Sequence, residues 1–175
     1  MRQTVETPTL TLRALTPDDA AAVARILGDA RVAKMLRVVP HPLPAGAAER
    51  YIARRGGGVA PEHALAIRGK GETALRGVVS VKFFADSDGA RIGFWLDPAW
   101  QGKGVMSEAA AGVADALFED GAPWLAAEVH AGNPAARRVL EKLGFAFDDT
   151  RDPAQARLDA THWRARRLDP TRAKA

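Results

Sequence analysis

The fold is decided by the stretch Ile92-Gly93-Phe94-Trp95-Leu96-Asp97-Pro98-Ala99-Trp100-Gln101-Gly102-Lys103-Gly104-Val105-Met106-Ser107-Glu108-Ala109. Its apolar beginning predicts a strand, its two later glycines predict a tight loop, and its end predicts the first turn of a helix. Such a loop turns several backbone N–H groups and the positive end of the helix dipole toward one point, which favours a phosphate group. Lys103 adds a positive charge for the same ligand. The stretch therefore predicts an anion site between a strand and a helix.

The segment after this loop has the pattern of a helix, a strand and a second helix. Apolar residues recur at helical spacing from Gly104 to about Asp120, namely Val105, Ala109, Val113 and Leu117, with Met106 and Ala110 beside them. A strand is predicted over 124–130, and we expect it to pair in parallel with the strand over 90–96 through a right-handed crossover. Asn133 and Pro134 mark the start of the next helix, and Gly144 marks its end.

The chain before the stretch supplies further strands and helices. Strands are predicted over 9–15, 63–68, 74–84 and 90–96, and the last three follow one another closely enough to form an antiparallel meander. Helices are predicted from Thr16 to Gly28, after Asp29, and over 45–55. The prolines of 40–44 make a stiff loop, which is either a simple connection or the wall of a pocket. Two more strands are predicted, one starting at 145 and one over about 157–167.

Length and composition indicate one globular domain. The chain has 175 residues, of which 47% are hydrophobic and 26% charged, which is enough for a substantial core. We expect a single domain over 1–175, with its core over about 8–167 and a charged tail over 168–175. The absence of cysteine excludes disulfides, thiolate zinc sites and cysteine nucleophiles. The four histidines lack the H-x-x-x-H spacing, so no metal site is expected.

The net charge of +4 has two interpretations. It either attracts an acidic ligand, such as nucleic acid or a phosphorylated cofactor, or reflects solvated arginines. Because the basic residues are not interleaved with aromatic ones, we expect no nucleic-acid partner. The first residues show no signal peptide and no run of the chain is apolar enough to span a bilayer, so we expect a cytoplasmic protein without membrane contact.

Two motifs in this order carry a resemblance to a known family. The first is the stretch over 95–109, and the second is Asn133-Pro134-Ala135-Ala136-Arg137-Arg138-Val139-Leu140-Glu141-Lys142-Leu143-Gly144-Phe145. Together they resemble the GNAT superfamily of acetyl-CoA-dependent N-acetyltransferases, and they look most like RimJ/RimL-type enzymes, which acetylate protein N-terminal amines. The resemblance covers about residues 8–167 and includes the loop before Tyr51. It implies an α+β GNAT fold with a mostly antiparallel twisted sheet of about seven strands, a parallel pair splayed around the cofactor, and helices on both faces.

The resemblance implies acetyl-CoA as cofactor and assigns residues to it. The Q/R-x-x-G-x-G/A positions of the family fall on Gln101, Gly104 and Met106, the last a departure from the usual Gly or Ala. Backbone amides over 102–107 would wrap the pyrophosphate, and the preceding strand would hydrogen-bond the pantetheine arm through the backbone of Trp95 and Leu96. The implied cofactor-binding residues are Phe94, Trp95, Leu96, Gln101, Gly102, Lys103, Gly104, Val105, Met106, Ser107, Asn133 and Arg138.

Three of these assignments leave alternatives open. A backbone N–H near Phe94 or Trp95 would polarise the thioester carbonyl. The Asn133 side chain would bind the cofactor arm, cap the following helix, or do both. Arg138 would reach the nucleotide phosphates or remain a solvated helix residue.

The chain departs from its relatives in the residues that move protons. Family members often carry a general-acid Tyr or Ser on the helix after Asn133, but here the corresponding positions are Leu140 and Ala136. RimJ/RimL-type enzymes often carry a glutamate just before the Ile-Gly-aromatic run, where this chain has Arg91. A general base therefore has to come from elsewhere, or the reaction has to do without one.

Glu128 and His130 are the candidate catalytic residues, because both lie on one face of the strand expected beside the thioester. Alternatively, Glu128 pairs with an arginine and His130 is merely a polar residue at a strand end. His63 is a third choice. Catalysis without a base is a further alternative, in which ordered water takes the proton and proximity supplies most of the acceleration.

The leading hypothesis is an N-acetyltransferase that moves an acetyl group directly from acetyl-CoA to a primary amine, either a protein N-terminus or a small molecule. Two alternatives remain: an acyltransferase that uses another acyl-CoA, and a catalytically weak CoA-binding sensor module. We expect the loop over 36–44 and the charged tail to shape the acceptor pocket, but no motif indicates the acceptor itself. Either a monomer or a homodimer is compatible with the sequence.

Overall fold

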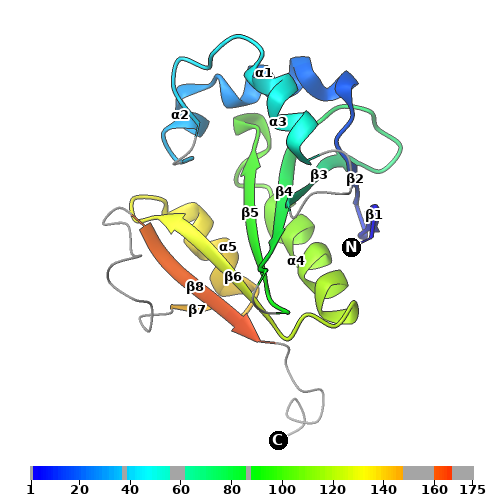
Figure 1. The fold of residues 1–175 in the computed structure, drawn as a ribbon, viewed down its shortest axis with the longest axis vertical. Coiled ribbons are helices and arrows are strands. Elements are labelled where there is room, and N and C mark those ends of the chain that lie inside the picture. Colours follow the sequence, from blue (N-terminus) through cyan, green and yellow to red (C-terminus); the bar gives the residue numbers. More distant parts are fainter. Residues whose placement is uncertain (1, 37–38, 56–61, 86–87, 148–159, 167–175) are drawn as a thin grey trace, which may run out of the picture.

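The computed structural model describes residues 2–36, 39–55, 62–85, 88–147 and 160–166, which form one twisted sheet with helices against both faces (Figure 1). The strands are β1 (Thr4–Glu6), β2 (Leu10–Ala14), β3 (Glu62–Gly69), β4 (Gly77–Phe83), β5 (Ala90–Leu96), β6 (Trp124–His130), β7 (Ala146–Phe147) and β8 (Ala160–Arg166). The helices are α1 (Ala20–Leu27), α2 (Ala30–Ala33), α3 (Ala47–Arg55), α4 (Val105–Glu119) and α5 (Pro134–Lys142), with short 3-10 turns at Pro17–Asp19 and Pro98–Trp100.

The sheet confirms the predicted fold class. Its strand order is β1-β2-β3-β4-β5-β6-β8-β7, and within the described residues every neighbouring pair is antiparallel except β5 and β6, which are parallel. The edge strand β1 was not predicted. The expected charged tail over 168–175 and the start of the last predicted strand lie outside the described residues. None of the helices in the described ranges is long and apolar enough to cross a bilayer.

The parallel pair separates after a short contact. β5 and β6 are paired only from Ala90 with Leu125 to Ile92 with Ala127. Beyond this point β5 continues to pair with β4 as far as Leu96, while β6 pairs with β8 as far as His130. Because each strand follows a different neighbour, a gap opens between their carboxyl-terminal halves. The predicted splayed pair is therefore present.

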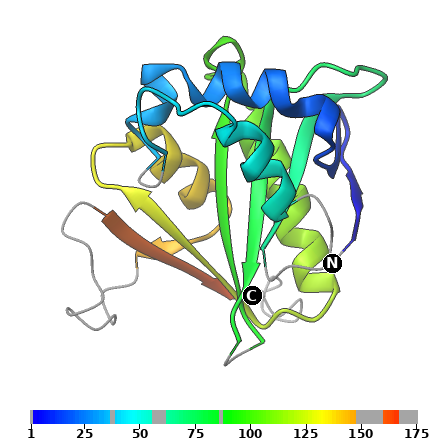
Figure 2. The ribbon, with the colours of Figure 1, turned by 45° about the horizontal axis from the view of Figure 1, so that its top comes forward.

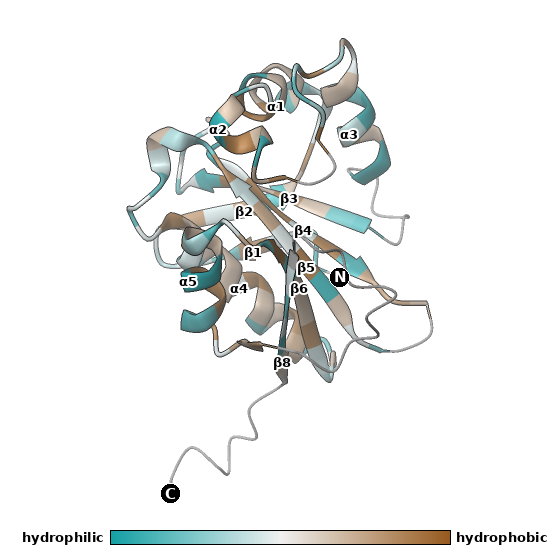
Figure 3. Cartoon of the chain, turned by 90° about the vertical axis from the view of Figure 1, so that its left-hand side faces the viewer, coloured by the Kyte–Doolittle hydropathy of each residue, from teal (hydrophilic) through white to brown (hydrophobic). Residues whose placement is uncertain are grey.

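Helices lie against both faces of the sheet (Figure 2), and a cluster of buried hydrophobic residues lies on each face. One layer packs α4 and Leu140 of α5 against inward residues of the strands, among them Ile92 and Leu96 of β5. The other packs α1, α2 and α3 against the opposite face, where Trp95 of β5 is buried. Successive side chains of a strand point to opposite faces, so β5 contributes to both layers. Both α3 and α5 contain hydrophilic residues, which are teal in Figure 3.

Helix α4 is held at the position that the sequence predicts. Its apolar stripe is buried, with Ala109 and Val113 fully inaccessible to solvent. Its first turn is also anchored by Glu108, whose carboxylate accepts hydrogen bonds from the Thr7 hydroxyl at 2.6 Å and from both the N–H and the hydroxyl of Thr9 at 2.7 Å. These contacts join the start of α4 to the segment between β1 and β2. The loop that precedes α4 is therefore attached to a fixed helix.

Candidate active site

A cleft of about 770 Å³ occupies the gap between β5 and β6. Its walls come from β5, the glycine loop, the starts of α4 and α5, β6, and the side of α2 and α3. Both Phe94, which packs with the α4 layer, and Trp95, which packs with the α1–α3 layer, line it. The cleft therefore passes through the sheet and opens toward both faces.

The glycine loop forms one end of this cleft. Gly102 and Gly104 have positive φ angles of 75° and 79°, and Gly104 is the N-cap of the 15-residue helix α4. Residues with a side chain rarely adopt this backbone conformation, which explains why both positions are glycine. The first N–H groups of a helix have no partner within the helix, and they carry the positive end of its dipole. The backbone of this loop therefore fits an anion such as a pyrophosphate.

Most of the predicted loop residues line the cleft, but Lys103 does not. The lining residues include Gln101, Gly102, Gly104, Val105, Met106 and Ser107. The Nζ of Lys103 instead lies 5.0 Å from the centre of the Trp100 ring. Lys103 can thus add positive charge near the loop only from the outside.

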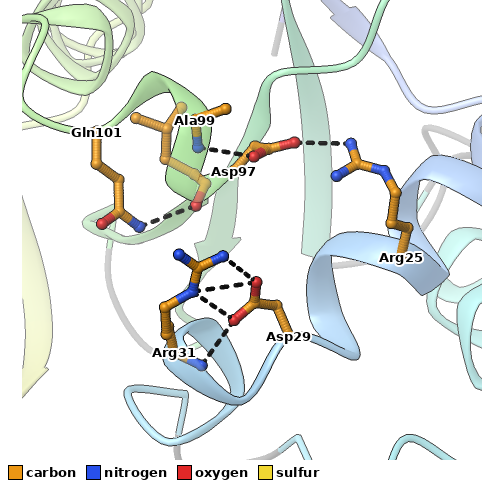
Figure 4. Close-up of polar contacts among 7 residues, drawn as sticks. Arg25, Asp29, Arg31, Asp97, Ala99 and Gln101 are labelled. Atoms are coloured by element: carbon orange, nitrogen blue, oxygen red, sulfur yellow. Dashed lines mark hydrogen bonds and ion pairs between the residues drawn. The ribbon is translucent and has the colours of Figure 1, made fainter.

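The turn between β5 and the loop is fixed by two side chains (Figure 4). Asp97 is buried, and its carboxylate accepts the Ala99 N–H at 2.9 Å and Nη2 of Arg25 at 2.7 Å. Gln101 turns its amide back so that Nε2 donates to the Leu96 carbonyl at 3.2 Å. The side chain of Gln101 therefore braces the loop through Leu96.

We expect the Asp97 carboxylate in this turn to make a measurable contribution to stability. Burial alone would raise the pKa of Asp97, but the Ala99 N–H and the Arg25 guanidinium more than offset this and hold its pKa below the ordinary value of 3.8. We expect Asp97→Ala to lower the free energy of unfolding at pH 7 by about 2 kcal/mol, because two donors lose their acceptor. Urea unfolding followed by circular dichroism measures this loss.

The sign of the pH dependence follows from the depressed pKa. Asp97 stabilises the fold fully above its unfolded-state pKa, and this contribution is lost as the pH falls through the lower folded-state pKa. The difference in the free energy of unfolding between wild type and Asp97→Ala should therefore become smaller when unfolding is repeated below pH 4. Arg25→Gln should cost about 0.5 kcal/mol or less, because the Arg25 side chain is 61% exposed. If this difference in the free energy of unfolding stayed constant with pH, the stabilising role of the Asp97 carboxylate would be wrong.

The backbone of β5 offers hydrogen-bonding groups to the gap. Asp97 donates its N–H to Arg76 beside β4, and the Gly93 carbonyl accepts the Ser80 hydroxyl, also on the β4 side. Because N–H and C=O groups alternate along a strand, those of Phe94 and Leu96 face the opposite side, toward the gap. No β6 residue pairs with this part of β5. An extended ligand in the gap can therefore bond to the backbone of Phe94 and Leu96. The backbone groups of Trp95, expected as a contact, face β4 instead.

The start of α5 also lines the cleft that the glycine loop lines. Asn133 caps the helix, since its Oδ1 accepts the Ala136 N–H at 3.0 Å, which confirms the capping interpretation. Asn133 also lines the cleft, so its amide nitrogen can serve a ligand at the same time. Arg138 lines the cleft as well, and its Nε donates to the Pro134 carbonyl at 3.3 Å.

Glu128 and His130 both lie in the cleft, on one face of β6. The Glu128 Oε1 lies 3.3 Å from Nη1 of Arg91 on β5 and 3.6 Å from Nε2 of His162 on β8. The predicted pairing with an arginine is therefore present. The carboxylate still reaches the cleft, so pairing and a chemical role are compatible.

The ring of His130 is oriented by its own turn. The Gly132 N–H donates to its Nδ1 at 3.1 Å, and this bond selects the tautomer with the proton on Nε2. The third candidate, His63, is not among the cleft residues, and its ring packs edge-on against Phe83 at 5.8 Å. Burial lowers the pKa of His63.

Leu36 and Val39 line the cleft, and both belong to the loop over 36–44 that was expected to shape the acceptor pocket. Four further lining residues on the same side were not identified from the sequence, namely Val32, Met35, Tyr51 and Arg55. Helical spacing indicated that Val32, Met35 and Leu36 belong to an apolar stripe, and the proline-rich segment suggested a pocket wall. No local pattern showed that these residues would meet β5 and β6.

Comparisons with known proteins agree with this architecture. A family model for the acetyltransferase (GNAT) domain matches residues 9–146. No curated protein sequence matches the chain. One similar solved structure is a GNAT-family acetyltransferase from Bacillus anthracis, with 21% identity, a TM-score of 0.77, and coverage of 93% of this chain and 98% of that one.

Two further solved structures show the same similarity. An acetyltransferase from Agrobacterium tumefaciens C58 has 20% identity and a TM-score of 0.78, covering 94% of this chain and 95% of that one. RimL, a ribosomal L7/L12 alpha-N-protein acetyltransferase in complex with coenzyme A, has 19% identity and a TM-score of 0.76, covering 93% and 97%. At such identities these likenesses show a shared fold, while the family model spans well over half of the chain. This protein therefore belongs to the GNAT acetyltransferase family, and it is an N-acetyltransferase that uses acetyl-CoA.

Proposed function

We propose that the chain transfers the acetyl group of acetyl-CoA directly to a primary amine that enters from the α2–α3 side of the sheet. The observation that carries this proposal is the cleft through the sheet, which is lined both by the glycine loop before α4 and by Glu128 of β6. Two reactants that enter from opposite faces would meet at the β5–β6 gap. Holding them in that geometry supplies much of the acceleration for a bimolecular reaction.

The residues around the gap suit coenzyme A. Backbone N–H groups over 102–107 would bind its pyrophosphate, with Arg138 nearby for further phosphate charge. The pantetheine arm would lie between β5 and β6 as an added strand, bonded to Leu96 and to the Asn133 amide. The acetyl carbonyl would then accept the Phe94 N–H, the group that the alternation of β5 turns toward the gap. Acetyl-CoA supplies the activated acetyl group.

Glu128 suits the role of general base better than His130. A base must accept a proton from the amine, and Glu128, which lines the cleft on β6, carries a carboxylate that can do so. In His130 the lone pair on Nδ1 is already used by the Gly132 N–H, and the other nitrogen carries a proton. We therefore assign proton removal to Glu128 and hydrogen-bond donation to His130.

The proton balance needs no covalent enzyme intermediate. The unprotonated amine attacks the acetyl carbon, a C–N bond forms, the C–S bond breaks, and the amine proton leaves through Glu128. The sulfur takes a proton from solvent, because Ala136 and Leu140 stand at the positions where relatives carry an acid, and neither can donate one. The products are an acetylated amine and free coenzyme A.

The acceptor proposed here is the α-amine of a protein or peptide. The RimL neighbour is described as acting on a ribosomal protein at its α-amine, which supports this choice. A small-molecule amine is the second candidate acceptor.

The experiment that tests the function measures coenzyme A release with a thiol reagent. Acetyl-CoA is mixed with the protein and a panel of peptides with free N-termini and small amines, and acetylated products are identified by mass spectrometry. We expect at least one peptide to be acetylated on its α-amine. Tight CoA binding without turnover on any acceptor would favour the sensor module, and faster turnover with succinyl-CoA would favour another donor.

A further inference from the structure

The end of the cleft away from the glycine loop is built mainly from apolar side chains. Val32, Met35 and Leu36 come from α2 and the residues after it, Val39 follows, and Tyr51 comes from α3. Val32 is buried, and the other four are half-buried. We refer to these five residues as the acceptor wall, because they line the cleft on the α2–α3 side, whereas the residues proposed to bind coenzyme A come from β5, the glycine loop and α5.

Two described arginines that line the cleft beside the acceptor wall have carboxylate partners. Nη2 of Arg31 lies 2.6 Å from the Asp29 carboxylate. Nη2 of Arg55 lies 2.7 Å from Glu62, and its guanidinium stacks over the Tyr51 ring at 4.5 Å from the ring centre. The five residues of the wall themselves carry no charge. What it offers is a surface for an apolar group.

Tyr51 is the single tyrosine of the chain, and its hydroxyl is in an unusual position. Its Oη accepts Nε1–H of Trp95 at 3.2 Å, so the tyrosine proton must point elsewhere. Within the described residues, no acceptor lies within hydrogen-bond distance of that proton. Burial raises the pKa of Tyr51, so the hydroxyl keeps its proton at neutral pH. A buried donor without an acceptor is costly, and a ligand in the cleft that Tyr51 lines can supply the acceptor.

We propose that the acceptor carries a large apolar side chain and a carbonyl group on the carbon next to its amine, as does a peptide that begins with leucine, methionine or phenylalanine. Its side chain packs on the acceptor wall, and its first carbonyl oxygen accepts the Tyr51 hydroxyl. This inference rests on the proposed acetyl transfer to an α-amine and specifies its substrate class.

One experiment combines a variant with a truncated substrate. Tyr51→Phe removes only the hydroxyl, and 3-methylbutylamine is the leucine skeleton without its carbonyl. We expect Tyr51→Phe to raise the KM for a leucine-initiated peptide about tenfold, the effect of losing one well-placed hydrogen bond. The KM for 3-methylbutylamine and the Kd for coenzyme A should not change. An equal loss on both acceptors would overturn the assigned role of the hydroxyl.

A second experiment tests the apolar wall with matched peptides. Peptides that differ only in a first residue of leucine, methionine, serine or aspartate are compared by kcat/KM. We expect leucine and methionine to exceed serine by about tenfold or more, since apolar contacts of this size discriminate by that order. Met35→Asn should reduce the preference severalfold, whereas Lys34→Asn, the adjacent exposed position, should leave it unchanged.

The outcomes separate this inference from the proposed function. Acetylation of serine- and aspartate-initiated peptides as fast as the others would overturn the substrate class and leave acetyl transfer intact. Absence of turnover on every peptide and amine, with coenzyme A bound, would overturn both.

Discussion

Replacement of Gly104 by valine is expected to raise the Kd for coenzyme A by at least about 100-fold, the scale of losing several charge-assisted backbone hydrogen bonds. Gly104 has a φ of 79° at the N-cap of α4. A β-branched residue cannot hold this conformation without a cost of about 1–2 kcal/mol, so the loop would relax away from it. Its N–H groups would then no longer point to one place, and the new side chain would enter the space for the pyrophosphate. Isothermal titration calorimetry measures the effect.

A matched control separates ligand binding from backbone strain. Gly71 lies in the turn between β3 and β4, has a φ of 74°, and, like Gly104, has no atom within 4 Å of the position of an added Cβ. Gly71→Val should cost a similar amount of stability while coenzyme A binds with unchanged affinity. If both variants bind coenzyme A as the wild type does, the assignment of the glycine loop to the pyrophosphate is wrong.

Replacement of Glu128 by glutamine is expected to lower kcat by about 10²–10³-fold, the usual contribution of a positioned general base. The amide keeps the size of the side chain but cannot take a proton, while the glycine loop and β5 are untouched. The Kd for coenzyme A should therefore stay within about twofold of the wild-type value. Steady-state kinetics with the best acceptor from the peptide panel, together with calorimetry, measure both quantities.

The control for Glu128 is a second paired glutamate, outside the cleft. Glu119 at the end of α4 contacts Arg2 at 2.8 Å, and neither residue is among those that line the cleft. Glu119→Gln should leave kcat close to the wild-type value. A decrease of less than threefold in Glu128→Gln would instead support catalysis without a protein base, in which ordered water accepts the proton.

The parts of the fold that follow from local pattern were predictable. The strands over 90–96 and 124–130 are bounded as expected, because each is a short apolar run between clear turn signals. The helix α4 follows its apolar stripe, and Asn133 caps α5 as its position before a proline indicates. The edge strand β1 was not predicted because it has only three residues, which is too short for an alternation of apolar and polar residues to be recognised.

The side-chain contacts of the site could not be predicted in the same way. The amide of Gln101 turns back to Leu96, a choice that depends on the shape of the turn. Glu128 meets His162, which is 34 positions further along the chain and reaches it only because β6 and β8 pair in one register. Tyr51 and Trp95 come together through the packing of α3 on the sheet. Such contacts arise from tertiary packing, which periodicity does not encode.

The passage through the sheet has a consequence for how the two reactants can be exchanged. Coenzyme A would leave toward α4 and α5, and the acetylated product would leave toward α2 and α3, so neither departure has to wait for the other. Initial-rate patterns should accordingly fit a ternary complex with random order of binding. The two halves can also diverge independently: exchanging the segment over 30–55 for that of another family member should transfer acceptor preference while leaving the affinity for coenzyme A as it is.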